Sequence, residues 1–217
     1  MYGVKDMDEQ EKRRRALGIS ERMFQQTDLA CFAAGTRIET ECGMVAVEAL
    51  RDGMLIETMD RGLQPLRRVL GKRVDGRGAL APVVIDTGVF GNVRPLWLSP
   101  HHRMVVSGWR AELLTGEPEV LASARDLVDG NRIWVQPVEE VAYFHLLLDR
   151  HEIVFAEGAP SESYHPLADD ATDLSPATLA EIEAIFPDLG RAFWEGTLLG
   201  GTVRPCARPE EAALLLW

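Results

Sequence analysis

Between residues 31 and 158 the chain consists of short runs in which apolar and polar residues alternate. A period of two buries one face of an extended segment, and it predicts β-strands. Turn signals rich in Gly, Asp and Asn separate the runs at intervals near ten residues. The runs are TRIET, MVAVEAL, DGMLIETMDRG, LRRVLGKRV, APVVIDTG, PLWLSP, RMVVSGW, RIWVQP, VAYFHLLL and HEIVFAEG. About ten short strands with this spacing predict a mostly β domain, either a barrel or a complex sandwich.

Helical patterns lie mainly at the two ends of the chain. Residues 6–26 are rich in helix formers and predict a solvated helix or a partly ordered arm, with the KRRR run on its solvated face. Ser175 and Pro176 form a good N-cap and N1 pair before apolar residues at helical spacing. The terminal PEEAALLLW predicts a second short helix, and residues 122–131 predict one in the middle of the chain.

These patterns divide the chain into an N-terminal helical arm, a β domain and a C-terminal helical extension. We expect them to span residues 1–30, 31–165 and 166–217. The C-terminal extension is expected to pack against the β domain. Four tryptophans are predicted to be core or packing residues because of their large apolar rings: Trp97, Trp109, Trp134 and Trp194.

The overall charge argues against a nucleic-acid-binding surface. The 217 residues carry a formal net charge of -11, whereas phosphate binding needs clustered Lys and Arg. No apolar run approaches the length of about 18 residues needed to span a membrane, so no membrane span is expected. The charged N-terminus has no apolar stretch behind it and does not resemble a secretory signal. We therefore expect a cytoplasmic protein, and export through another signal stays open.

The three cysteines do not form a disulfide or zinc pattern. Cys31, Cys42 and Cys206 are odd in number and include no C-x-x-C pair, which fits a reducing compartment and predicts neither a metal nor another cofactor. Cys42 lies in an ECG turn and Cys206 lies near the chain end, and both are expected to be bystanders. Cys31 opens the β region, where it is either a small buried hydrophobe or a nucleophile.

Five histidines allow a Cys–His arrangement, although a single histidine is more often structural than catalytic. His101 and His102 follow a turn at Ser99, and adjacent strand residues point to opposite faces. At most one of the two therefore faces a given site, which makes a metal pair a weak interpretation. His145 lies within a predicted strand, and His151 lies at a DRH turn that it can simply cap.

Three blocks occur in a specific order along the chain: CFAAGTRIET, LSPHHRMVV and AYFHLLLDRHEIVFAEGAPSESY. In this order they resemble the Hint domain family, which comprises the autoprocessing modules of inteins and Hedgehog proteins and their bacterial relatives. The resemblance is to the bacterial, intein-like type, and it covers roughly residues 31–165. It implies a horseshoe-like all-β fold.

The resemblance implies that the Cys31 thiolate attacks the carbonyl of Ala30 in an N-to-S acyl shift. An amide is more stable than a thioester, so a site must protonate the leaving nitrogen and stabilise the oxyanion. Ser99 and His102 align with the Thr-x-x-His of the second family block. The alignment implies that His102 polarises the scissile amide and donates the proton.

The third block departs from the family pattern at His145, where inteins often carry Asp. His145 is expected to act as a base on the Cys31 thiol, and Thr36 and His151 are candidates for supporting roles.

The end of the resemblance lacks the His-Asn pair that splicing needs, because it reads GAPSESYHP. We therefore expect thioester formation at Ala30–Cys31 without splicing. The thioester would be cleaved by water, or its acyl group would pass to an outside thiol or amine. The substrate is then the chain's own N-terminal segment, residues 1–30. Either this is a short host segment, or the chain is a stand-alone relative whose activity has decayed.

Two other hypotheses stay open. The departures at Ser99 and His145, the missing Asn and the short upstream segment favour a catalytically decayed Hint-fold β module that serves binding or assembly. A conventional cysteine hydrolase acting on separate substrates is the third. Replacement of Cys31 by Ala separates the first two, because it abolishes self-cleavage but leaves a purely binding module unchanged.

Overall fold

The computed structural model describes residues 30–164 and 202–216. The predicted helices at 6–26 and from Ser175 lie outside the described residues, as does Trp194. The strands are β1 (Phe32–Ala33), β2 (Arg37–Thr40), β3 (Gly43–Ala46), β4 (Leu55–Thr58), β5 (Gly62–Pro65), β6 (Arg68–Asp75), β7 (Val83–Ile85), β8 (Leu96–Leu98), β9 (Arg103–Ser107), β10 (Glu119–Ser123), β11 (Ile133–Val135), β12 (Glu140–Leu147), β13 (Ile153–Ala156) and β14 (Ala159–Glu162). The helices are α2 (Trp109–Thr115) and α5 (Pro209–Ala212), with short 3₁₀ turns η1 (Val47–Ala49), η2 (Gly78–Leu80) and η3 (Ala124–Leu127).

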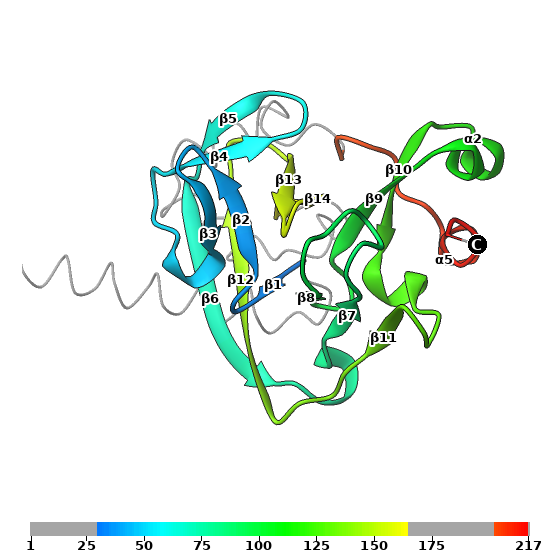
Figure 1. Cartoon of the computed structure of the whole chain (residues 1–217), viewed down its shortest axis with the longest axis horizontal. Coiled ribbons are helices and arrows are strands. Elements are labelled where there is room, and N and C mark those ends of the chain that lie inside the picture. Colours follow the sequence, from blue (N-terminus) through cyan, green and yellow to red (C-terminus); the bar gives the residue numbers. More distant parts are fainter. Residues whose placement is uncertain (1–29, 165–201, 217) are drawn as a thin grey trace, which may run out of the picture.

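The strands form two sheets. One sheet has the order β11-β7-β8-β1-β12-β6, and the other has the order β10-β9-β14-β13-β2-β4-β5, with β3 paired to β2. The eight-residue strands β6 and β12 pair along their whole length and form a long ribbon on one side of the molecule (Figure 1). The fold class predicted from the alternating pattern, a mostly β domain, is confirmed.

The two-residue strand β1 lies inside the first sheet. Phe32 is paired with Leu98 of β8 on one edge and with Phe144 of β12 on the other. Phe32 also belongs to the large apolar core, and burial of such a side chain stabilises the fold by about 1.5–3 kcal/mol. The start of the β domain is therefore held at the centre of the molecule rather than at its edge.

More strands are present in the described residues than the ten expected, because the predicted runs did not include β1, β5, β10 and β14. The strand β14 directly follows the predicted run HEIVFAEG, since Glu157 (φ 50°) and Gly158 (φ 89°) both adopt the left-handed conformation that reverses the chain after β13. The predicted helix at 122–131 is only the 3₁₀ turn Ala124–Leu127.

The helix α2 was not predicted from the sequence. It begins after Gly108 and ends at Gly116, which is left-handed with a φ of 82°, and its seven residues are too few to show a helical period. The prediction that Trp109 packs in the core is wrong, because its side chain is 66% exposed on α2. Neither α-helix in the described part of the chain is long and apolar enough to cross a membrane.

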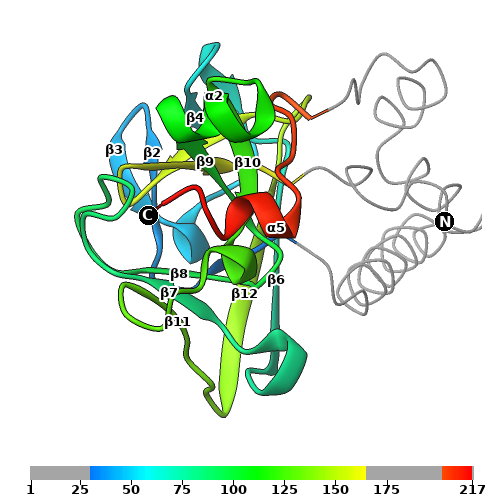
Figure 2. The ribbon, with the colours of Figure 1, turned by 90° about the vertical axis from the view of Figure 1, so that its right-hand side faces the viewer.

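Residues 202–216, named here the C-terminal strap, pack against the second sheet (Figure 2). Leu121 of β10 and Cys206 form a parallel bridge, and the predicted short terminal helix is present as α5. The Arg204 guanidinium lies 2.7 Å from Asp60 and 2.6 Å from Glu119. Apolar side chains of the strap also enter the main core, namely Ala212 and Leu215.

Candidate functional site

The peptide nitrogen of Cys31 is held by Ser99, the residue that follows β8. The Cys31 N–H donates to Ser99 Oγ at 2.9 Å, and the Ser99 N–H donates to the Cys31 carbonyl oxygen at 3.0 Å. This reciprocal pair continues the contact between β1 and β8 by one residue. It fixes the orientation of the Ala30–Cys31 peptide, which is the bond that Cys31 is expected to attack.

The carbonyl oxygen of the same peptide is bonded to His145 on β12. His145 Nδ1 lies 2.7 Å from the Ala30 oxygen, and because a carbonyl can only accept, Nδ1 carries the proton. Burial lowers the pKa of His145 to about 4, against the opposing effect of the bond to Ala30, so the ring is neutral near pH 7. In the neutral ring the lone pair is on Nε2.

The Cys31 thiol lies against the same imidazole ring. Its Sγ is 3.4 Å from Nε2 and 3.6 Å from Nδ1 of His145. Nearly equal distances place the sulfur beside the ring rather than on the line of one lone pair, so a small movement is needed before Nε2 accepts the thiol proton. Cys31 is only 3% exposed, and burial raises the pKa of its thiol far above the usual value, with the Ser99 hydrogen bond opposing. The resting cysteine is therefore a protonated thiol.

His102 is completely buried, and within residues 30–164 and 202–216 neither of its ring nitrogens has a hydrogen-bond partner. Its ring meets the Phe32 ring edge-on, with 4.4 Å between centroids. Burial lowers the pKa of His102 to about 4, while the nearby Glu162 carboxylate opposes that shift. A buried polar group without a hydrogen-bond partner is costly and rare.

Sequence reasoning missed Tyr164, which packs on His145 with 4.6 Å between ring centroids. Burial and the neighbouring Cys31 raise the pKa of the Tyr164 hydroxyl, so the phenol stays neutral. The Tyr164 N–H donates to the Leu146 carbonyl oxygen at 2.9 Å, which places the ring beside β12. The signal for this residue was its place at the end of the third block, SESY.

The structure thus brings Cys31, Ser99 and His145 together around the peptide that follows Ala30. His102 lies on the Ser99 turn, because its N–H donates to the Ser99 carbonyl oxygen at 3.1 Å, but no hydrogen bond joins its ring to the described part of this peptide.

The two residues expected in supporting roles lie away from the reacting atoms. The Thr36 N–H donates to the Ala33 carbonyl oxygen at 3.2 Å, in the turn after β1. His151 Nε2 lies 3.3 Å from Glu162 Oε2, and both side chains are buried. Neither residue makes a hydrogen bond to Cys31 or Ala30 in the described part of the chain.

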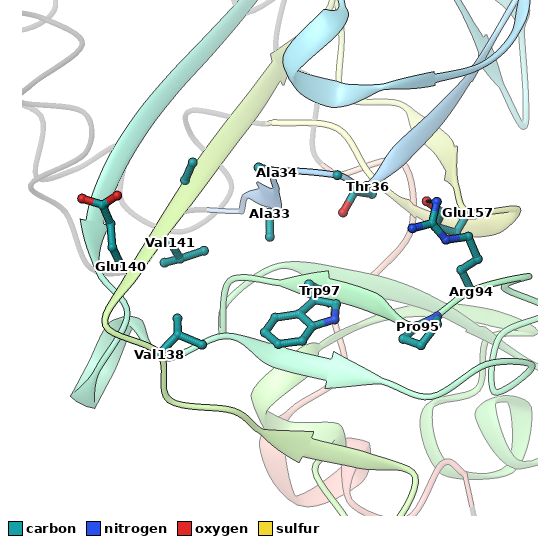
Figure 3. Close-up of a pocket in the computed structure, with 12 residues that line it drawn as sticks. Ala33, Ala34, Thr36, Arg94, Pro95, Trp97, Val138, Glu140, Val141 and Glu157 are labelled. Atoms are coloured by element: carbon teal, nitrogen blue, oxygen red, sulfur yellow. Dashed lines mark ion pairs between the residues drawn. The ribbon is translucent and has the colours of Figure 1, made fainter.

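A pocket of about 460 Å³ lies beside β1 and the beginning of β12. Ala33 and Val141 line it and also pack in one cluster with Cys31, and the Trp97 ring forms one wall (Figure 3). Arg94 and Glu157 stand at its charged rim, 4.0 Å apart. Cys31 itself does not line the pocket. The described residues contain no group of three or more His, Cys, Asp or Glu side chains arranged to hold a metal ion.

Comparisons with known proteins agree with this architecture. The family model described as Hint domain matches residues 30–168, which is more than half of the chain. The chain therefore belongs to the Hint domain family, as the three sequence blocks predicted, and it is in general terms an autoprocessing or splicing-type module. No curated protein matches the sequence.

Several solved structures are similar to the chain. A bacterial intein-like domain from Clostridium thermocellum is 12% identical with a TM-score of 0.40, over 62% of this chain and 97% of that chain. A DnaB intein from Synechocystis sp. PCC 6803 is 14% identical with a TM-score of 0.40, over 62% of this chain and 98% of that chain.

Proposed function

We propose that this Hint domain carries out an N-to-S acyl shift at Ala30–Cys31, which ends in cleavage or acyl transfer and not in splicing. The observation that carries the proposal is the double contact of His145. One ring bonds the scissile carbonyl oxygen through Nδ1 at 2.7 Å and touches the attacking sulfur at 3.4 Å through Nε2. A buried neutral imidazole in this position can stabilise the oxyanion and accept the thiol proton.

In the first step the Cys31 sulfur attacks the Ala30 carbonyl carbon while its proton passes to His145 Nε2. The carbonyl oxygen becomes an oxyanion, and the Nδ1–H already bonded to it stabilises that charge in a dry site. The nucleophile is attached to its target, so no entropy is lost in bringing them together. A tetrahedral intermediate results.

In the second step the bond between the Ala30 carbon and the Cys31 nitrogen breaks. Ser99 Oγ accepts the N–H of this nitrogen and so aims its new lone pair. We assign protonation of the nitrogen to His102, as the resemblance implies. Because burial keeps this ring neutral at rest, it first takes up a proton from solvent and then passes that proton to the nitrogen. His145 gains the proton that leaves sulfur and later returns it to solvent, so that both rings end neutral.

The chain lacks the asparagine with which splicing is completed. Its two asparagines are Asn92 and Asn131, and neither follows the last strand of the β domain. The Asn92 side chain is buried and donates to the carbonyl oxygens of Asp86 and Arg94, which gives it a structural role in a turn. The thioester is therefore resolved by water, or by an outside thiol or amine.

The burial of Cys31 also bears on the other two hypotheses. A thiol with 3% exposure does not suit a hydrolase that must admit separate substrates, whereas it suits attack on its own peptide. A decayed binding module would not need a buried imidazole with unpaired nitrogens, and His102 is one within the described residues.

The test uses the full chain with an N-terminal tag, incubated with and without dithiothreitol and followed by intact mass. We expect the thiol to release the fragment 31–217. Cys31→Ala should stay intact, while Cys42→Ala, which changes an exposed cysteine, should cleave like the parent. A parent chain that never yields the fragment at any thiol concentration would contradict the proposal.

A further inference from the structure

A buried carboxylate lies beneath the turn that carries Ser99 and His102. Glu162, on β14, is 1% exposed, and its Oε1 accepts the backbone N–H of Arg103 at 2.8 Å. Its Oε2 lies 3.3 Å from His151 Nε2 and 3.5 Å from the Arg103 guanidinium. A buried charge is tolerated only when it is paired in this way. Although burial raises the pKa of Glu162, these partners hold it below its usual value, so the carboxylate is ionised.

The contact with Arg103 fixes the peptide directly after His102. The His102 carbonyl oxygen accepts the Ala124 N–H at 2.8 Å, and the His102 N–H donates to the Ser99 carbonyl oxygen at 3.1 Å. The turn is therefore held at three successive backbone groups. Through Ser99 it reaches the nitrogen of Cys31, because Ser99 Oγ accepts the Cys31 N–H at 2.9 Å.

The C-terminal strap makes the next contact in the series. The backbone N–H of Val203 donates to His151 Nδ1 at 3.2 Å. A nitrogen that accepts carries no proton in the neutral ring, so the proton is on Nε2, which faces Glu162. The strap thereby selects the neutral tautomer of His151 whose Nε2 proton lies on the side of the Glu162 carboxylate, 3.3 Å away.

We propose that Glu162 and His151 are positioning residues for the cleavage reaction, and that the C-terminal strap acts through them by fixing the tautomer of His151. This proposal rests on the proposed function. A series of contacts leads from Val203 through His151 and Glu162 to the backbone of the His102 turn, and from Ser99 to Cys31. The groups at its two ends are 172 residues apart in sequence but joined by contacts of 2.8 to 3.3 Å.

The Glu162 carboxylate also affects the pKa of His102. The charged or titratable groups that influence it are Glu162 from β14, Arg103 from β9, His151 from the segment before β13, and His145 from β12. Only the Glu162 carboxylate favours the protonated ring, against burial, Arg103 and His151. Replacement of Glu162 by Gln keeps the shape of the side chain and removes this charge, so it should lower the pKa of His102 further.

The first experiment does not depend on cleavage. Full-length Cys31→Ala protein is studied by NMR of the imidazole nitrogens, with Glu162→Gln or with Val203→Pro. The proline removes the N–H donor, changes the side chain and fixes the local backbone. Val203→Ala is the matched control for the lost packing, because it keeps the N–H. We expect Glu162→Gln to lower the titration midpoint of His102 and Val203→Pro to give a mixture of His151 tautomers that Val203→Ala does not give.

The second experiment measures thiol-induced cleavage in the chain with Cys31 intact. Glu162→Gln should slow cleavage at neutral pH by about tenfold, the scale of one hydrogen bond to a charged group, and shift the pH profile toward acid. Glu162→Asp, which keeps the charge, should recover part of the rate. Val203→Pro should be slower than Val203→Ala.

An unchanged His102 titration in Glu162→Gln, or a single His151 tautomer in Val203→Pro, would overturn the proposal. So would a Glu162→Gln protein that cleaves with the rate and pH profile of the parent. If the parent chain itself does not cleave, the proposed function fails, and the NMR measurements still decide the positioning role separately. Unfolding midpoints of all variants show whether a loss of rate reflects a loss of fold.

Discussion

At the scale of single residues, the site depends on two buried histidines with different surroundings. His145 bonds the Ala30 carbonyl oxygen and touches Cys31, whereas His102 has no hydrogen-bond partner for its ring in the described residues. Both rings are neutral at rest because burial lowers their pKa values to about 4. The two rings can therefore take opposite roles, one as a proton acceptor and hydrogen-bond donor, the other as a proton donor in its charged form.

The contact of His145 with the carbonyl gives a direct prediction. His145→Ala removes the oxyanion donor and the base together, so thiol-induced cleavage should fall by about 10²–10³-fold, the usual effect of losing one oxyanion donor. His145→Gln keeps an N–H that can reach the carbonyl and should retain more activity than Ala. Intact mass over time measures both rates. If His145→Ala cleaves like the parent, the ring has no part in the chemistry.

At the scale of elements, β12 pairs with β1 on one edge and approaches β6 closely on the other. Gly71 of β6 is paired with Phe144, and a Cβ at Gly71 would lie 2.5 Å from the Phe144 ring. The ring fills the space that the glycine leaves, on the strand that pairs with β1.

Gly71→Ala should therefore push Phe144 toward β1 and destabilise the fold. We expect a loss of about 1–3 kcal/mol in the free energy of unfolding, the usual effect of overpacking, measured by urea denaturation. Arg73→Ala, two residues along β6, removes an exposed ion pair to Glu140 and should change stability little. Equal unfolding midpoints for Gly71→Ala and the parent would show that the ring moves without cost.

Some of these elements and contacts could be predicted from the sequence, and others could not. Alternation identified most strands, and the three ordered blocks identified the family and the neighbourhood of Cys31, Ser99 and His145. The contacts of Glu162 could not be predicted, because a period of two cannot say which buried partner lies on the next strand. The role of the C-terminal strap depends on a backbone N–H, which carries no sequence signal. The helix α2 was too short to show a period.

At the scale of the whole molecule, the buried histidines make stability depend on pH. His102 and His145 have folded-state pKa values of about 4, below the usual value of 6.5. The unfolded chain binds protons more readily in the window between these values. Their contribution to stability is therefore complete above about pH 6.5 and is lost as the pH falls toward 4.

We expect the free energy of unfolding of Cys31→Ala protein to fall between pH 7.5 and pH 5, by on the order of 2 kcal/mol for each histidine. Urea titrations at the two pH values measure the change. His145→Gln in the same background removes one of the two groups and should show a smaller loss between the same pH values. A stability that is constant over this range would mean that both rings can be protonated in the folded state without cost.

The placement of β1 has a consequence for the direction of the reaction. Phe32 is paired on both edges, so an amine freed by the proposed acyl shift would be held close to the thioester. The nitrogen of Cys31 is held by Ser99 in the intact chain, and we expect the freed amine to stay beside Ser99. In the proposed reaction this amine would compete with water for the acyl group, because its attack would re-form the original peptide bond. The proposed acyl shift would therefore be reversible, and an incoming thiol or amine would have to react with the thioester before the Cys31 amine re-forms the peptide bond.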